Sequence, residues 1–369
     1  MWKLREMLRG RTARELFMLL GKGVAGATTA TVGLCAGVGA YGAYSINQPR
    51  QRWFTDNFVL TPETMRLPYK KVTIETEDGI LLDAWFMEQT VRGKASSNLV
   101  LCCNPYNQDK SSLLGVARGL WDSGYSVLLY DFRSHAREQT HQTIGYLEKR
   151  DGDAALDWLC ANKPKDGRIG LVGASMGGAV ALMLAAERRP EVIACATDCA
   201  FSCLKDVIGT RLDRMFPTTR LFGMDSILPL HVLFLESICF MTRIIYGYDP
   251  AMVGPRHELG NIDIPLLIVH SEKDSVVPLS HGFEVHSLSG SSEKEFFVVK
   301  NAEHIESFFL DEKEYTRRIV GFFDDVFGNA PAGLFVAGHE AQHQANIKIA
   351  SAKRKISQQK QRQQASEAA

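Results

Sequence analysis

Six short apolar runs between residues 98 and 300 constrain the fold of this 369-residue chain more than any other feature. Apolar and polar residues do not alternate within them, which is typical of strands buried on both faces. Helix-like stretches follow several of the runs, so we expect an α/β fold with a doubly wound, mostly parallel sheet. The runs are NLVLCC (98–103), YSVLLYD (125–131), RIGLVG (168–173), EVIACATD (191–198), PLLIVHS (265–271) and EFFVVK (295–300).

Two other segments modify this pattern. KVTIETEDGILLDAWFM (71–87) has the composition of two alternating strands joined at Asp78–Gly79, so the sheet should start with an antiparallel hairpin. The stretch 201–261 interrupts the strand–helix rhythm and is apolar, yet charged residues and a proline break it. Since charges at the centre of a bilayer are costly, we expect a helical cap there rather than a membrane span.

The domain boundaries follow from these segments. We expect the main domain at 70–328, with the cap insertion at about 201–261 and a linker at 45–69 before it. The tail at 329–369 is rich in Gln, Ala and Lys, which predicts disorder or a frayed helix. HEAQH (339–343) matches the zinc-protease pattern, but a polar terminal segment offers no pocket for a metal.

The N-terminus has a different composition. Residues 1–23 are basic, and residues 24–44 carry no charge over a length that would span a bilayer as a helix. We therefore expect a transmembrane helix at 24–44, a single-pass membrane protein and a cytoplasmic N-terminus. The alternatives are a signal peptide cleaved near the small residues Ala40–Ala43, an organellar presequence or a buried helix. Gly33 and Gly37 have the spacing of a helix-dimer contact, so a weak homodimer is a further expectation.

Charge and cysteine content exclude several classes of function. The formal net charge is zero, so nothing favours nucleic acid as a partner. The eight cysteines form no CxxC pair and no Cys/His ligand spacing, so we expect no metal site. No feature of the sequence implies an organic cofactor. Most of the cysteines lie in apolar runs and resemble buried thiols, which favours a reducing compartment, whereas the expected anchor favours export.

The motif Gly173-x-Ser175-x-Gly177 lies between the apolar run 168–173 and a helix-like stretch at 177–190. A strand–turn–helix context is what a nucleophile elbow requires, because the tight turn tolerates only small neighbours. The serine hydroxyl then lies at a helix N-terminus, where the dipole favours developing negative charge. Ser175 is therefore the candidate nucleophile, and Gly173 and Gly177 are the elbow glycines.

A serine nucleophile needs a base, and the base needs an orienting carboxylate. Asp274 follows the run 265–271, and His304 follows the run 295–300. Both therefore fall at the sheet edge where Ser175 is expected, in the order serine, acid, histidine. The competing acids are Glu272 and Asp198, and the competing bases are His257, His281 and His286.

Oxyanion stabilisation needs two backbone N–H groups. We expect one from Met176, which follows the nucleophile, and the other from the loop NPYNQDKSS after the run 98–103.

Residues 70–328 resemble the α/β-hydrolase family in its serine-hydrolase branch of esterases, lipases and peptidase-like members. The stretches ETEDGILLDAWFM, LLYDFRSHAREQ, LVGASMGGAVAL, DCAFSCLKDV, IPLLIVHSEKDSVVP and NAEH carry the resemblance. It implies the α/β-hydrolase fold and the triad Ser175, Asp274 and His304. It also implies Tyr106 as the second oxyanion donor, because the family donor follows a His-Gly pair.

This chain departs from the family at two places. Asn104–Pro105 stands where the family has His-Gly, and proline has no N–H to donate. DFRSHARE lacks the glycine that often follows the histidine, and we interpret Asp131 and Arg133 as a structural turn at a strand end.

Together these features predict a membrane-anchored serine hydrolase that cleaves carboxylic esters of acyl or lipid-like substrates. One alternative is a peptidase or amidase, for which Arg211, Arg214 and Arg220 would bind a substrate carboxylate. The other is a catalytically silent scaffold, favoured by Asn104–Pro105.

Overall fold

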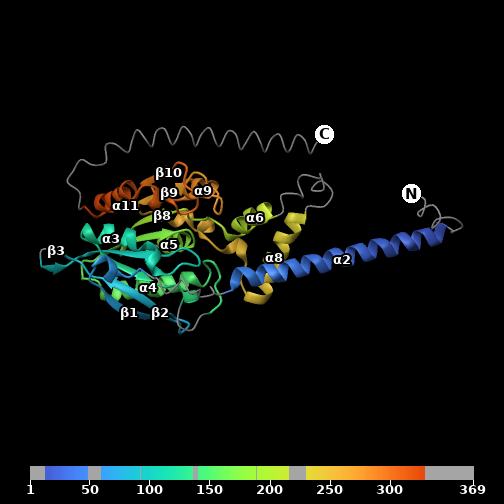
Figure 1. The fold of residues 1–369 in the computed structure, drawn as a ribbon, viewed down its shortest axis with the longest axis horizontal. Coiled ribbons are helices and arrows are strands. Elements are labelled where there is room, and N and C mark those ends of the chain that lie inside the picture. The colour runs from blue at the N-terminus through green and yellow to red at the C-terminus, as the bar shows by residue number, and fades with distance from the viewer. Residues whose placement is uncertain are drawn as a thin grey trace. The chain divides into compact units, whose positions relative to one another are not determined.

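The computed structural model describes residues 13–48, 60–91, 93–135, 140–187, 189–215 and 230–328, and eight of its strands form one sheet (Figure 1). The strand order is β1-β2-β6-β5-β7-β8-β9-β10. Pairing is antiparallel from β1 to β6 and parallel from β6 to β10, which confirms the expected sheet and its starting hairpin. The strands are β1 (Lys70–Glu75), β2 (Leu81–Met87), β5 (Asn98–Cys103), β6 (Ser126–Tyr130), β7 (Arg168–Ala174), β8 (Val192–Asp198), β9 (Leu266–Ser271) and β10 (Lys294–Val299), with β3 (Thr90–Val91) and β4 (Lys94–Ala95) pairing separately.

Helices cover both faces of this sheet (Figure 1). Apolar residues of α3 and α11 share one core with side chains from β5 to β9, whereas α5 and α4 pack together on the other face. The α-helices are α2 (Ala13–Asn47), α3 (Leu114–Asp122), α4 (Glu148–Asn162), α5 (Met176–Ala186), α6 (Leu204–Met215), α8 (Leu230–Tyr246), α9 (Ser280–Leu288), α10 (Ser307–Leu310) and α11 (Glu312–Phe327). The 3-10 turns are η2 (Pro62–Met65), η3 (Lys110–Leu113), η4 (Arg133–His135), η6 (Pro250–Met252), η7 (Pro255–His257) and η8 (Leu259–Asn261).

Helix α11 illustrates how local signals set the elements. Asp311 caps its N-terminus by accepting the N–H of Glu314 at 3.0 Å, and Gly328 ends it at φ 73°. Its buried residues include Ile319 and Phe323, four positions apart, so one face of the helix packs on the sheet.

The chain divides into two compact units. The unit of residues 46–211 and 251–369 contains the sheet, and the unit of residues 1–45 and 212–250 contains most of α2 and all of α8. Within the second unit, Ser237 Oγ donates to the carbonyl of Cys35 at 2.5 Å. A Cβ at Gly39 would lie 2.7 Å from the carbonyl oxygen of Ser237, so glycine permits this close helix contact.

The expected membrane span is wrong. Among the described residues, no helix combines the length and the hydropathy that crossing a bilayer requires. Helix α2 is long enough, but its uncharged part at 24–44 consists largely of Gly, Ala and Thr, whose small side chains gain little from leaving water. The expected single-pass localisation and cytoplasmic N-terminus depended on that span, so they are not supported either.

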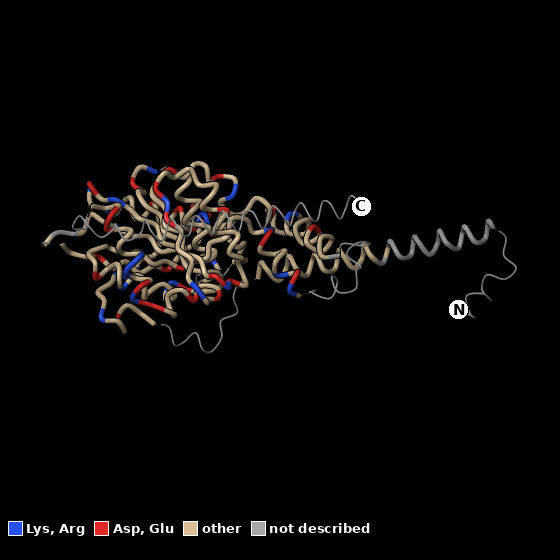
Figure 2. The backbone as a smooth tube through the Cα atoms, turned by 90° about the horizontal axis from the view of Figure 1, so that it is seen from above, with Lys and Arg blue, Asp and Glu red and all other residues tan. Residues whose placement is uncertain are grey.

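Two other expectations stay open. No described atom lies within 4 Å of a Cβ built at Gly33 or Gly37, and the homodimer through these glycines stays a prediction. The tail at 329–369, including HEAQH, lies outside the described residues. Figure 2 shows Lys and Arg mixed with Asp and Glu over the sheet-containing unit, in keeping with the zero net charge of the chain.

Candidate active site

Ser175 lies in a tight turn between β7 and α5. Its backbone adopts φ 53° and ψ −118°, a strained conformation for a residue with a side chain. Its N–H donates to the carbonyl of Asp198 at 2.8 Å, which ties the turn to the end of β8. A Cβ at Gly173 would lie 2.2 Å from the carbonyl oxygen of Gly177, so residue 173 must be glycine for the turn to close.

The structure brings together the three residues that the sequence singled out. His304 Nε2 lies 2.8 Å from Ser175 Oγ, and His304 Nδ1 lies 2.6 Å from Asp274 Oδ2. Because a carboxylate only accepts, Nδ1 carries the proton and the Nε2 lone pair faces the serine hydroxyl. This is the tautomer that a general base needs.

The carboxylate of Asp274 is held from several sides. Its Oδ1 accepts the N–H groups of Val276 at 2.9 Å and Val277 at 2.7 Å. Buried His270 donates its Nε2–H to the carbonyl of Val277 at 2.9 Å and so stabilises the same turn. Burial is the largest single influence and raises the pKa of Asp274. The hydrogen bond and charge of His304, the N–H of Val277 and the charge of His270 together outweigh it, so the pKa lies below its usual value.

The competing acids have other partners. Glu272 accepts the N–H of Asn301 at 3.1 Å and so supports the loop that carries His304. Asp198 is buried at the end of β8, accepts Ser307 Oγ at 3.2 Å, and has its pKa raised to about 6 by burial.

The competing histidines lie on other elements. His257 belongs to η7, while His281 and His286 belong to α9. His281 Nδ1 bonds to Ser202 Oγ at 2.8 Å, and the His286 ring lies 5.9 Å from the ring of Phe296. Of the four candidate bases, His304 is the one at Ser175.

Within the part of the chain that the structure describes, the expected oxyanion donors have no hydrogen-bond acceptor. Neither the N–H of Tyr106 nor that of Met176 donates to a described residue. A Cβ at Gly177 would lie 2.0 Å from the carbonyl oxygen of Cys103, so the start of α5 packs directly on the end of β5, where the Tyr106 loop begins.

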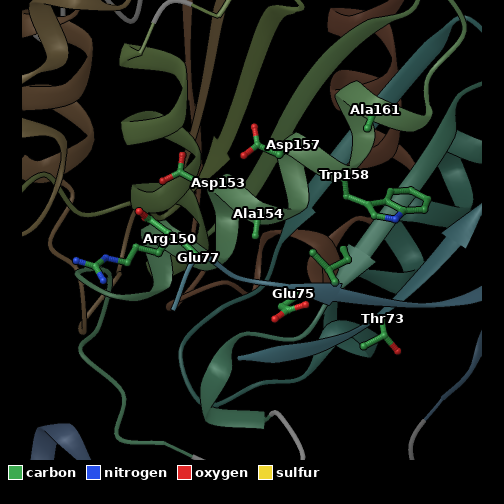
Figure 3. Close-up of a pocket in the computed structure, with 10 residues that line it drawn as sticks. Thr73, Glu75, Glu77, Arg150, Asp153, Ala154, Asp157, Trp158 and Ala161 are labelled. Atoms are coloured by element: carbon green, nitrogen blue, oxygen red, sulfur yellow. The ribbon is translucent and has the colours of Figure 1, made fainter. Parts of the chain in front are cut away.

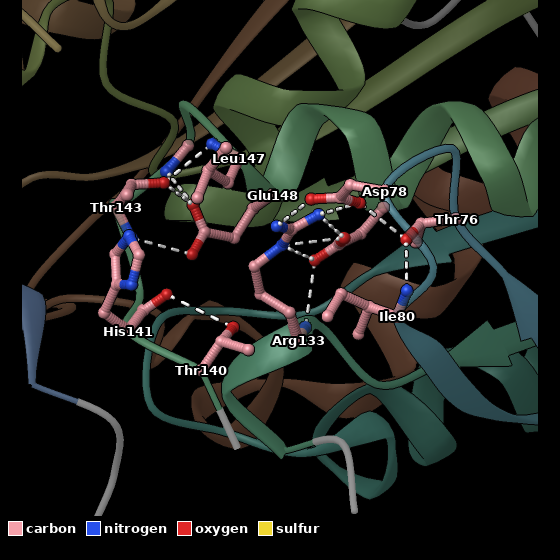
Figure 4. Close-up of polar contacts among 11 residues, drawn as sticks. Thr76, Asp78, Ile80, Arg133, Thr140, His141, Thr143, Leu147 and Glu148 are labelled. Carbon is pink, nitrogen blue, oxygen red and sulfur yellow. Dashed lines mark hydrogen bonds and ion pairs between the residues drawn. The ribbon is translucent and has the colours of Figure 1, made fainter. Parts of the chain in front are cut away.

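Ion pairs support the loops around this edge of the sheet. Asp131 and Arg133, for which the sequence indicated a structural role, take part in them. Lys110 donates its N–H to Asp131 at 2.8 Å and also forms an ion pair with it. Arg133 is buried between Asp151, at 2.7 Å, and Asp78, at 2.8 Å (Figure 4). These pairs connect the β1–β2 turn, the end of β6 and helix α4.

Sequence reasoning missed His270, Lys110 and Gln142 as supporting residues. Gln142 is buried and donates to Tyr106 Oη at 3.0 Å. The histidine directly before the acid loop could have been noticed in HSEKD, but no local pattern marks the other two.

Among the described residues, one group brings three metal-ligating atoms within 4.8 Å of one another, from Cys199, Asp274 and His304. Two of them already share the 2.6 Å hydrogen bond between the carboxylate and the imidazole. The group is therefore part of the candidate active site rather than a separate centre.

A groove of about 520 Å³ lies elsewhere, between β1 and α4 (Figure 3). Acidic side chains and Trp158 line it, and the three residues of the Ser175 site do not. Asp153 and Asp157 in this groove are already paired with Arg189.

Comparisons with known proteins agree with this architecture. A family model described as X-Pro dipeptidyl-peptidase (S15 family) matches residues 69–225. An uncharacterized protein of Bacillus subtilis is 26% identical over 62% of this chain and 72% of its own length. Protein bem46 of Schizosaccharomyces pombe is 25% identical over 74% of this chain and 83% of its own length.

A solved structure carries the comparison of folds. An esterase from Pyrococcus furiosus superposes with a TM-score of 0.60 at 24% identity, covering 76% of this chain and 98% of the esterase. The α/β-hydrolase fold expected from the sequence is confirmed.

Proposed function

We propose that this chain is a serine hydrolase that cleaves carboxylic esters of acyl or lipid-like substrates through an acyl-enzyme. The observation that carries the proposal is the continuous hydrogen-bonded path from Ser175 through His304 to Asp274, at 2.8 and 2.6 Å. The strained backbone of Ser175 supports it, because strain of this kind is concentrated at functional sites.

In this mechanism Ser175 attacks the substrate carbonyl while His304 takes the hydroxyl proton. The carboxylate of Asp274 keeps the imidazole in the required tautomer and stabilises its charged form. The N–H groups of Tyr106 and Met176 bind the developing oxyanion. His304 then gives the proton to the leaving alcohol, and water, activated by the same imidazole, hydrolyses the acyl-enzyme.

A peptidase or amidase is the second candidate, and the match to the S15 peptidase model favours it. Burial raises the pKa of Tyr106 and the positive charge of Arg211 opposes this shift, so Arg211 is a candidate to attract a substrate carboxylate. Arg214 lies in α6, and Arg220 lies outside the described residues.

The test is labelling with a fluorophosphonate probe, which reacts with a serine whose base and oxyanion donors are assembled. We expect the wild-type protein to be labelled and Ser175→Ala not to be. Ser202→Ala serves as a matched control, because Ser202 also contacts a histidine, His281, but lies outside the proposed site.

Folded wild-type protein that stays unlabelled would contradict the proposal and favour the catalytically silent scaffold. If labelling occurs, kcat/KM for a panel of esters and dipeptidyl amides separates the two hydrolases. Faster cleavage of the amides would replace the esterase assignment by the peptidase.

A further inference from the structure

The loop after β5 carries the proposed oxyanion donor Tyr106, and this chain lacks the His-Gly pair expected there. Its side chains are held instead by Gln142, whose Nε2 lies 3.0 Å from Tyr106 Oη and 3.0 Å from Asn107 Oδ1. Tyr106 Oη also makes a long contact of 3.5 Å to the carbonyl of Ile46. Pro105 fixes its own φ, and Asn107 is bound by Gln142. The backbone N–H of Tyr106 is therefore restrained by both neighbouring residues and by its own phenol.

Gln142 also binds the end of helix α2. Its backbone N–H donates to the carbonyl of Asn47 at 3.2 Å, and its Nε2 donates to the carbonyl of Gln48 at 2.5 Å. A carbonyl only accepts, so the amide nitrogen must face Gln48 and the orientation of the side chain is fixed. Tyr106 and Gln142 thus bind three successive carbonyls, at Ile46, Asn47 and Gln48, near a helix end that leaves such groups unpaired.

Gln142 rests on a rigid base. The buried carboxylate of Glu148 accepts the N–H of Thr143 at 2.9 Å, its hydroxyl at 2.8 Å, and the N–H of Gly145 at 2.7 Å. Figure 4 shows Glu148 beside Thr143, next to the network of Arg133. The segment carrying Gln142 is therefore fixed to the first turn of α4.

We propose that Gln142 and the phenol of Tyr106 are positioning groups, which hold the backbone N–H of Tyr106 at the oxyanion in place of the missing His-Gly loop. This inference rests on the proposed serine hydrolase function and extends it to residues that touch no reacting atom. The end of α2 is part of the same arrangement, because its carbonyls bind both side chains.

The physical basis is preorganisation. A donor stabilises the transition state only if it is already aimed at the oxyanion, and a displacement of about 1 Å can reduce the rate by about 100-fold. Tyr106→Phe removes the hydroxyl and leaves the backbone N–H in place. Gln142→Met keeps a side chain of similar length and removes both amide donors.

The experiment measures kcat and KM for an ester substrate, and the rate of fluorophosphonate labelling, in Tyr106→Phe, Gln142→Met and the double variant. We expect kcat and the labelling rate to fall together by about 10- to 100-fold, with KM changed less than about twofold. The double variant should be no worse than the more damaged single variant, because one hydrogen bond joins the pair. Tyr41→Phe, at an exposed tyrosine of α2, is the control and should leave both rates unchanged.

Three results distinguish the possibilities. Folded single variants with kcat within about twofold of wild type would overturn the inference and leave the proposed hydrolase intact. A rise in KM alone, or additive losses in the double variant, would also overturn it, since either indicates a structural or binding role. Wild-type protein that is not labelled would overturn the proposed function and this inference with it. If Gln142→Met does not fold, Tyr106→Phe decides the question.

Discussion

At the scale of the residue, His281 shows how burial selects a protonation state. Its Nδ1 accepts the backbone N–H of Ser202 at 3.2 Å, so the neutral ring fits and a protonated ring would set two donors against each other. Burial lowers the pKa of His281 to about 4, although the charges of Asp206 and Glu284 oppose the shift. Arg256 and His270 also face it and lower the pKa further.

This pKa predicts a loss of stability in acid. The folded pKa lies below the usual value of 6.5, so the unfolded chain binds more protons between pH 6.5 and pH 4 and stability falls as the pH drops through that window. Between pH 7 and pH 5 we expect His281 to contribute a loss of about 2 kcal/mol. His281→Asn keeps an acceptor for the N–H of Ser202. Between pH 7 and pH 5 its free energy of unfolding should therefore fall by that amount less than the wild-type value, as measured by urea denaturation at both pH values. Equal losses in the two proteins would contradict the assignment.

At the scale of the element, the elbow depends on the close packing of α5 against β5 and β7. A Cβ added at Gly177 would clash with backbone atoms of Cys103 and Asn104, which cannot rotate away as a flexible side chain would. Residue 177 must therefore be glycine because the loop that carries Tyr106 packs directly against it. Its substitution should affect the candidate site as well as the stability of the fold.

Gly177→Ala should destabilise the fold by about 1 to 3 kcal/mol and sharply reduce fluorophosphonate labelling, because the added methyl pushes apart the two segments that carry the oxyanion donors. Gly321→Ala in α11 is the matched control. No described atom lies within 4 Å of a Cβ built there, so this change should stabilise the helix by about 0.5 to 1 kcal/mol and leave labelling intact. Unchanged labelling in folded Gly177→Ala would refute this account of the elbow.

At the scale of the whole molecule, the segment between β8 and β9 differs from the rest of the chain. Its helix α8 exposes large apolar side chains, including Phe240, Ile244 and Ile245, each more than half exposed. Single exposed apolar residues are ordinary, but a group of them on one helix is typical of a surface that contacts an apolar molecule.

An apolar acyl group predicts a dependence on chain length. Each buried methylene contributes about 0.8 kcal/mol, so kcat/KM should rise at least about tenfold from acetyl to octanoyl esters of one alcohol. Initial rates with p-nitrophenyl esters measure this, with Ser175→Ala as the blank. A flat profile would refute the lipid-like substrate and leave the serine hydrolase mechanism standing.

The sequence by itself determined the order of elements and which residues are the candidates for the central site. Apolar patterning is a local property, so the run 168–173 corresponds to β7 at Arg168–Ala174, and the helix-like stretch 177–190 corresponds to α5 at Met176–Ala186. The positions after the ends of parallel strands meet at one edge, so Ser175, Asp274 and His304 could be placed together before any coordinates were known. The same local reasoning failed for residues 24–44, where absence of charge was taken for sufficient hydropathy.

Only the tertiary structure decided which partners those residues have. Asp274 and Glu272 follow β9, and Asp198 is the last residue of β8. The choice among these acids depends on distances to His304 that no local pattern encodes. The link from Gln142 to Tyr106 joins residues 36 positions apart, and it forms because the end of α2, the loop after β5 and the start of α4 meet in space. Side-chain hydrogen bonds of this kind arise from packing between segments, and for that reason they leave no periodic signal in the chain.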